Sequence, residues 1–297
     1  MTEAIFTLGD GRKISYAVYG PPSGEPVLYF HGTPSSRREI LLLQAYGINV
    51  HDLLVQYGIR IIAPDRGSQS THHPQRTFLS FAADTEQLLR HLGVKQCPVL
   101  CWSGGGPYAL AMAYRFPNIV SGVYILCGIT KPFDKTVLQQ MGLNKWYFLT
   151  ARYAPLLLQA ALGFVRRRKT KHLPPQQFSG LPYVDYKLLQ QQLKDVAGLT
   201  LKEATRRGAK TMVQEAASYF GHYGFDVKDI QQPIHYWWGS LDMNVVELHA
   251  KEVETNATTA IMHYREGEGH LSLYIKAFAE ALQAIARADA SHTSFDR

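Results

Sequence analysis

Short apolar runs alternate with segments of helical periodicity along the first 130 residues. The apolar runs have the length of buried strands and cover residues 26–30, 59–63, 98–102 and 120–127. The segments with apolar positions at helical spacing cover residues 41–57, 80–92 and 106–116. A hairpin around Gly9 and Gly11 is predicted over residues 4–18. Buried strands that alternate with helices predict an α/β fold, in which helices cover both faces of a parallel sheet.

The pattern changes after Gly128 and returns only much later in the chain. Residues 131–230 contain helical stretches and loops without strand-like runs. Two further strand-like runs and a last helix are then expected at residues 234–238, 259–264 and 271–287. We therefore predict one core, formed by residues 1–130 and 231–297, into which residues 131–230 insert as a helical cap. The tail from residue 290 is expected to fray.

Composition and charge are those of an ordinary globular protein. The chain has 297 residues, 46% of them hydrophobic, which suffices for a large buried core. The net charge of +7 fits an anionic ligand or a membrane surface, but nucleic acid would need a denser basic face, so no nucleic-acid partner is expected. No run reaches the ~18 apolar residues of a membrane span, and the first residues lack the basic-then-apolar plan of a signal peptide.

The cysteines suggest a reducing environment. Cys97, Cys101 and Cys127 lie in or beside strand-like runs, and no CxxC spacing occurs. Such residues are typical of reduced cysteines in a core. We therefore expect a cytoplasmic protein without a cysteine-based metal site.

The stretch CWSGGGPYAL, residues 101–110, follows a predicted strand and opens a predicted helix. Each glycine costs roughly 1 kcal/mol relative to alanine in a helix, so three in a row indicate a special demand on the backbone. A serine at such a sharp turn adopts a positive φ and needs small residues two positions before and after it, here Cys101 and Gly105. We predict that Ser103 is a nucleophile at a helix N-terminus; the alternative is a glycine-rich turn with an idle serine.

A nucleophilic serine needs a base, and the base needs an orienting carboxylate. His270 lies in the segment EGEGHLSLY, between the last predicted strand and the last helix. Asp242 lies in HYWWGSLDMNVV, just after the preceding predicted strand. The order Ser103, Asp242, His270 along the chain is that of one known type of catalytic triad. We expect the three side chains to meet at the carboxyl ends of the strands.

A tetrahedral oxyanion needs two backbone donors. The segment VLYFHGTPSS ends a predicted strand and turns at residues 31–34. We predict that the oxyanion hole consists of the amide N–H groups of Thr33, in this turn, and of Gly104, directly after the nucleophile. An ordinary turn with a helix-capping serine is the alternative for the first of these.

Taken together, these motifs make the chain similar to the α/β-hydrolase family over nearly its full length. The matching pieces are FHGTP, APDRG, CWSGGGPYAL, WWGSLDMNV and GEGHLSL. The resemblance implies an eight-stranded, mostly parallel sheet with a cap inserted after the sixth strand. The segment APDRGSQSTHH is shorter than the glycine-rich loop of many relatives, and we interpret its Asp65 and Arg66 as loop-shaping residues.

The resemblance leaves a second candidate for the acid of the triad. Some relatives take this residue from the loop after the sixth strand, where Asp134 lies in this chain. Asp242 is favoured because it follows the seventh predicted strand.

The type of residue at the nucleophile position limits the reactions that the resemblance implies. Relatives that open epoxides or remove halide carry an aspartate at the position of Ser103, whereas a serine implies acyl transfer to water. We predict hydrolysis of a carboxylic ester or thioester of a hydrophobic small molecule, through an acyl-enzyme and without a metal or organic cofactor. The alternatives are a small-molecule receptor with a residual triad, an acyltransferase, and a hydrolase of carbon–carbon bonds next to a ketone.

The predicted cap contains an apolar segment that ends in cations. Pro155 divides residues 144–172 into two helical pieces, and residues 156–165 are apolar on all sides except Gln159. Such a helix must be buried or in contact with lipid. The cations that follow are Arg166, Arg167, Arg168, Lys169 and Lys171. In one interpretation the apolar piece roofs the catalytic pocket; in the other the cap also makes a weak contact with an anionic membrane or an anionic acyl donor.

Overall fold

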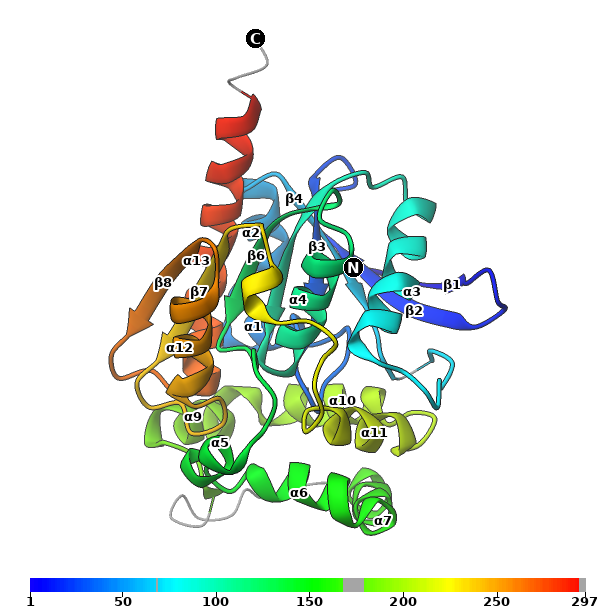
Figure 1. The fold of residues 1–297 in the computed structure, drawn as a ribbon, viewed down its shortest axis with the longest axis vertical. Helices are drawn as coiled ribbons and strands as arrows, with labels where there is room; N and C mark the ends of the chain where they lie inside the picture. Colours follow the sequence, from blue (N-terminus) through cyan, green and yellow to red (C-terminus); the bar gives the residue numbers. More distant parts are fainter. Residues whose placement is uncertain (68, 168–178, 294–297) are drawn as a thin grey trace.

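The computed structural model describes residues 1–67, 69–167 and 179–293, which form an eight-stranded sheet flanked by helices (Figure 1). The strands are β1 (Thr2–Thr7), β2 (Lys13–Tyr19), β3 (Glu25–Phe30), β4 (Ile59–Pro64), β5 (Cys97–Trp102), β6 (Val120–Leu126), β7 (Ile234–Gly239) and β8 (Ala260–Arg265). Their order is β1-β2-β4-β3-β5-β6-β7-β8. The pairs β1–β2 and β2–β4 are antiparallel, and every other pair is parallel. The predicted eight-stranded, mostly parallel sheet is confirmed.

Neighbouring residues of the central strands face opposite cores, as the pleat of a strand requires. In β3, Leu28 and Phe30 join one core, while Val27 and Tyr29 join the other. The first core is covered by α3 (Phe78–His91), α4 (Gly106–Arg115) and α12 (Glu247–Asn256). The second is covered by α1 (Leu41–Tyr46), α2 (Val50–Gln56) and α13 (His270–Thr293). Both faces of the sheet are therefore buried, which explains why its central strands read as continuous apolar runs.

The described part of the segment between β6 and β7 consists of helices and the loops that join them, without a strand. Its helices are α5 (Lys135–Gln140), α6 (Lys145–Tyr153), α7 (Pro155–Arg167), α9 (Tyr183–Leu188), η2 (Leu189–Leu193), α10 (Lys194–Ala204), α11 (Lys210–Ser218) and η3 (Val227–Asp229). Most of them gather below the sheet in Figure 1. Since β6 and β7 pair directly, this long segment leaves and re-enters the sheet at adjacent strands. The division of the chain into core and cap stays a prediction.

Two predicted helices differ from those of the structure. The predicted helix over 41–57 is two helices, because Gly47 ends α1 with a φ of 104° and Asn49 caps the start of α2. The last helix is predicted to end at residue 287 and the chain to fray from 290, whereas α13 continues to Thr293; residues 294–297 of the predicted tail lie outside the described residues. Alanines at positions 284, 286, 288 and 290 favour that continuation. None of the helices in the described part of the chain is long and apolar enough to cross a bilayer.

Candidate active site

The turn around Ser103 has the strained backbone that its sequence predicts. Ser103 has a φ of 54°, and residues Ser103–Gly105 form a short 3₁₀ turn that leads into α4. A Cβ at Gly105 would lie 2.2 Å from the carbonyl oxygen of Phe30, and one at Gly106 would lie 2.1 Å from that of Ile129. Neither position can accept a side chain. The glycines thus permit the close packing of this turn against two neighbouring segments.

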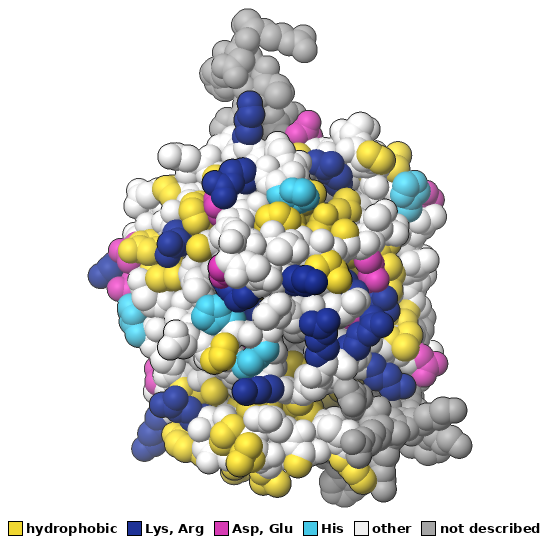
Figure 2. Space-filling model, turned by 90° about the vertical axis from the view of Figure 1, so that its right-hand side faces the viewer, with side chains coloured by type: hydrophobic (Ala, Val, Ile, Leu, Met, Phe, Trp, Pro, Cys, Tyr) yellow, Lys and Arg dark blue, Asp and Glu magenta, His cyan; other side chains and the backbone are white. Residues whose placement is uncertain are grey.

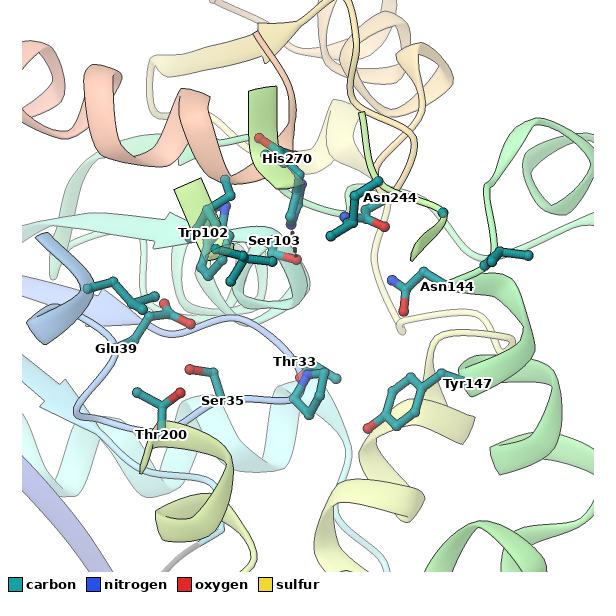
Figure 3. Close-up of a pocket in the computed structure, with 18 of the residues that line it drawn as sticks. Thr33, Ser35, Glu39, Trp102, Ser103, Asn144, Tyr147, Thr200, Asn244 and His270 are labelled. Carbon is teal, nitrogen blue, oxygen red and sulfur yellow. Dashed lines mark hydrogen bonds between the residues drawn. The ribbon is translucent and has the colours of Figure 1, made fainter. Parts of the chain in front are cut away.

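Ser103, His270 and Asp242 form a continuous chain of hydrogen bonds. The Nε2 atom of His270 lies 2.8 Å from the Oγ of Ser103 (Figure 3). Its Nδ1 atom lies 2.7 Å from the Oδ2 of Asp242. The other carboxylate oxygen of Asp242 accepts hydrogen bonds from the amides of Asn244 and Val245, at 2.8 and 2.9 Å. The carboxylate is therefore held on both oxygens, and it can keep His270 in the tautomer that accepts a proton from Ser103.

Two opposing effects act on the pKa of His270. Burial lowers the pKa of the imidazole, while the charge of Asp242 and its hydrogen bond raise it. The net pKa lies above the ordinary value of 6.5. The ring also stacks on Trp102, with 5.0 Å between the ring centroids. His270 thus has a fixed plane and a raised basicity, both of which suit a general base.

The alternative acid, Asp134, lies in a different setting. Its carboxylate caps α5 by accepting a hydrogen bond from the amide of Val137 at 2.8 Å, and it lies 3.7 Å from the ammonium of Lys131. Within the described part of the chain no hydrogen bond joins Asp134 to His270. The structure therefore brings Asp242, and not Asp134, to the imidazole.

The turn at Thr33 lies beside Gly104, the residue that follows Ser103. A Cβ placed on Gly104 would lie 2.7 Å from the Cβ of Thr33. The preceding amide, of Gly32, donates to the buried carboxyl group of Glu39 at 2.9 Å. No described residue accepts a hydrogen bond from the amide of Thr33. The two predicted oxyanion donors are thus neighbours; their catalytic role stays a prediction.

A buried ion pair joins the Thr33 turn to the helical segment between β6 and β7. Glu215 of α11 accepts a hydrogen bond from the Nε of Arg66 at 2.9 Å, and another from the Thr33 hydroxyl. The guanidinium of Arg66 also donates to the carbonyl oxygens of His31 and Gly32, both at 2.8 Å. Burial raises the pKa of the Glu215 carboxyl group, but the neighbouring charge of Arg66, together with the other contacts of this group, lowers that pKa by a larger amount. The net pKa is therefore below its ordinary value, and the carboxylate remains ionised. Arg66 thus holds the Thr33 turn, which is not the loop that the sequence analysis expected it to shape.

Tyr219, four residues after Glu215, also belongs to this network. The hydroxyl of Tyr219 donates to the carbonyl oxygen of Gly104 at 2.8 Å and lies 3.1 Å from Glu215. Neither Glu215 nor Tyr219, nor Glu39 on the other side of the turn, was a site residue in the sequence analysis. Glu215 and Tyr219 contact the turn across 182 and 186 positions of sequence, whereas Glu39 lies only seven positions from Gly32. None of the three belongs to a motif of the sequence analysis.

A cavity of about 440 Å³ opens beside Ser103 and is bounded by the sheet domain and by the helical segment between β6 and β7 (Figure 3). Its apolar lining comes from Leu42, Trp102, Leu143, Leu181, Leu189 and Leu271. Polar side chains that line it include Ser35, Glu39, Asn144, Tyr147, Thr200 and Asn244. Among the described residues, none of α7 lines this cavity. The expectation that the apolar helix roofs the pocket is therefore wrong; α6, α9, η2 and α10 contribute to the roof instead.

Cys127, Asp242 and His270 place three potential metal-ligating atoms within 4.8 Å of one another. Within residues 1–67, 69–167 and 179–293 no other such group occurs. Burial raises the pKa of the Cys127 thiol well above its usual range, whereas a metal site needs the thiolate. The other two residues are already hydrogen-bonded to each other. The three side chains are therefore better described as a hydrogen-bonded pair of Asp242 and His270 beside a neutral thiol than as a metal site.

Comparisons with known proteins agree with this fold. A family model described as the alpha/beta hydrolase fold matches residues 25–277. An uncharacterized hydrolase of Bacillus subtilis, YcgS, is 23% identical over 91% of this chain and 93% of its own length. A probable proline iminopeptidase of Streptomyces coelicolor is 29% identical, but over only 42% of this chain and 39% of its own.

Solved structures show the same likeness. A carboxylesterase structure from Nitrososphaera gargenis has a TM-score of 0.70 at 17% identity and covers 96% of this chain and 100% of its own. The esterase RhEst1 from Rhodococcus has a TM-score of 0.66 at 19% identity, with 97% and 99% covered. At these identities the likeness concerns the fold.

Proposed function

The chain belongs to the alpha/beta hydrolase fold family, and from that premise we propose that it is a serine hydrolase acting on carboxylic esters or thioesters of hydrophobic small molecules. The observation that carries the proposal is the chain of hydrogen bonds from Ser103 through His270 to Asp242. The apolar part of the cavity lining supports an apolar substrate, and the esterases among the structural relatives support ester chemistry.

The proposed mechanism uses only groups of this chain. The Oγ of Ser103 attacks the carbonyl carbon while its proton passes to Nε2 of His270. The amides of Thr33 and Gly104 bind the oxyanion, and such a donor contributes about 10²- to 10³-fold in rate. His270 then gives the proton to the leaving oxygen or sulfur, which leaves an acyl-enzyme on Ser103. Water attacks the acyl-enzyme with His270 again as base, and this step releases the acid and restores the serine.

Covalent labelling tests the nucleophile. A fluorophosphonate probe should label the protein at Ser103, and Ser103→Ala should lower turnover of an activated ester by on the order of 10⁶-fold. Ser240→Ala is the matched control, because the Ser240 hydroxyl accepts a hydrogen bond from Gly267 outside the triad. Labelling that persists in Ser103→Ala would contradict the assignment.

A panel of p-nitrophenyl esters of graded acyl length tests the substrate class. Longer acyl chains bury more apolar surface, so kcat/KM should rise from acetate to medium-chain esters. Many turnovers per enzyme would separate a hydrolase from a receptor that acylates once. Product that depends on an added alcohol or amine, at the expense of free acid, would instead favour an acyltransferase.

A second candidate is cleavage of an amide after an amino-terminal residue. The observation that favours it is the similarity to the iminopeptidase of Streptomyces coelicolor, which is restricted to part of both chains. The same triad can serve both reactions. Comparison of kcat/KM for an aminoacyl p-nitroanilide, prolyl included, with that for an acyl ester decides between them.

A further inference from the structure

The outward side of α7 is apolar and exposed. Leu156, Leu157 and Phe164 are 78, 66 and 56% exposed, although an apolar helix of this kind is expected to be covered. Leu157 and Phe164 are seven positions apart and therefore lie on the same side of the helix. Since α7 does not line the catalytic cavity, its apolar character is not explained by the active site.

The neighbouring helix extends the exposed apolar surface. Trp146 and Tyr153 of α6 are 59 and 77% exposed and are also seven positions apart. α6 packs directly against α7, and both lie at the end of the molecule farthest from the sheet (Figure 1). We call this surface the cap outer face; it consists of Trp146, Tyr153, Leu156, Leu157 and Phe164. Exposed aromatic and aliphatic side chains gathered on two adjoining helices indicate an interaction site.

The chain segment that carries the cap outer face has charges of one sign in its sequence. Residues 135–184 contain no Asp or Glu. Their cations are Lys135, Lys145, Arg152, Arg166, Arg167, Arg168, Lys169 and Lys171. Arg152 is exposed beside Tyr153, whereas Arg168, Lys169, Lys171 and the side chains of Arg166 and Arg167 lie outside the described part of the structure. Figure 2 shows basic and hydrophobic side chains together along the lower edge, at the level of the cap helices.

This charge distribution decides between two kinds of partner. A two-fold dimer through the cap outer face would bring the same cations against each other, with no acidic side chain of residues 135–184 to balance them. An anionic lipid surface would instead bind the cations while its interface takes up the aromatic and aliphatic side chains. We propose that the cap outer face docks on an anionic lipid bilayer. This surface is separate from the chemistry at Ser103, so the two proposals stand or fall independently.

Vesicle flotation tests the docking. The protein is mixed with vesicles of phosphatidylcholine alone, or of phosphatidylcholine with phosphatidylglycerol, at about 0.01 M and about 0.15 M salt, where the Debye length is about 30 and 8 Å. Wild-type protein should float with the anionic vesicles at low salt and much less at the higher salt. Neutral vesicles should bind at least tenfold less protein.

Three variants locate the contact. The double variant Leu157→Ser/Phe164→Ser should lower partition into anionic vesicles at least tenfold, and Arg152→Gln should lower it about fivefold at low salt. Val55→Ser is the matched control, because Val55 is 51% exposed on α2 and lies outside the patch; it should bind like wild type. Far-UV circular dichroism and thermal unfolding check that each variant is folded, and Ser103→Ala should bind vesicles normally.

Several outcomes would overturn the docking proposal. If the double variant floats as well as wild type, the cap outer face does not make the contact with the vesicles. If the protein binds neutral and anionic vesicles equally, or binds neither, an anionic bilayer is not its partner. A dimer that forms in sedimentation velocity without lipid, and that the double variant abolishes, would assign the face to a second copy of the chain.

Discussion

At the scale of single residues, the hydrogen bonds of Asp242 identify it as the residue that orients His270. Asp242→Asn should lower kcat on the order of 10⁴-fold, because an amide no longer favours the productive imidazole tautomer. Asp134→Asn is the matched control and should leave kcat near wild type, since this side chain caps α5. Steady-state kinetics on one activated ester would measure both. A large loss in Asp134→Asn, with none in Asp242→Asn, would contradict the structure.

The imidazole of His270 should also determine the pH dependence of activity. His270 acts as a base only when neutral, and its pKa in the folded protein is raised above 6.5 by Asp242, against the effect of burial. Activity should therefore be low in acid and should rise through a midpoint above pH 6.5. The pH profile of kcat/KM measures that midpoint. His222→Gln alters an exposed histidine and should not move it.

A midpoint below 6.5, or a rate independent of pH from about pH 5 to about pH 8, would argue against a histidine base with this environment.

At the scale of elements, α11 supports the Thr33 turn through Glu215. Glu215→Gln keeps the shape of the side chain but removes the charge that Arg66 needs, so the Thr33 turn should lose its fixed position. We expect kcat to fall about tenfold or more, short of the 10²- to 10³-fold loss of an oxyanion donor, with a small change in KM. Kinetics on a short ester, with KM and kcat separated, would show this split.

Glu203→Gln is the control for Glu215→Gln. Glu203 of α10 is equally buried and accepts a hydrogen bond from Arg37 at 2.8 Å. Its loss should lower stability while leaving kcat near wild type. If both variants lower kcat equally, Glu215 contributes to the stability of the fold and has no particular role in positioning the Thr33 turn.

At the scale of the whole molecule, a buried histidine links stability to pH. Burial lowers the pKa of His249 to about 3, from an ordinary value of 6.5. Between these values the unfolded chain binds a proton that the folded chain does not, so acid favours unfolding. His249→Gln should reduce the slope of unfolding free energy against pH by about 1.4 kcal/mol per pH unit between about pH 6 and about pH 5.

Urea unfolding at several pH values would give the two slopes. The exposed His222→Gln serves as control and should keep the wild-type slope. An unchanged slope in His249→Gln would show that His249 is protonated in the folded protein.

Local patterns were enough to predict most elements and the three residues around which the site is built. Burial of both sheet faces makes each central strand a continuous apolar run, and the observed strands begin and end within two residues of those runs. Ser103, Asp242 and His270 could be found because each lies within five residues after the end of a strand, where a parallel sheet brings its loops together. The positive φ at Ser103 was predicted from the sharp turn between strand and helix and from its small neighbours, Cys101 and Gly105.

Non-local contacts required the tertiary structure. Glu215 lies 149 positions from Arg66, and its pairing with Arg66 depends on how α11 packs on the core, which no nearby residue encodes. The same holds for α7. Its sequence determined that the helix is apolar, but only the packing decided that Leu157 and Phe164 face outward and away from the catalytic cavity. Hydrophobicity is a property of each residue, whereas burial depends on what the rest of the chain places against it.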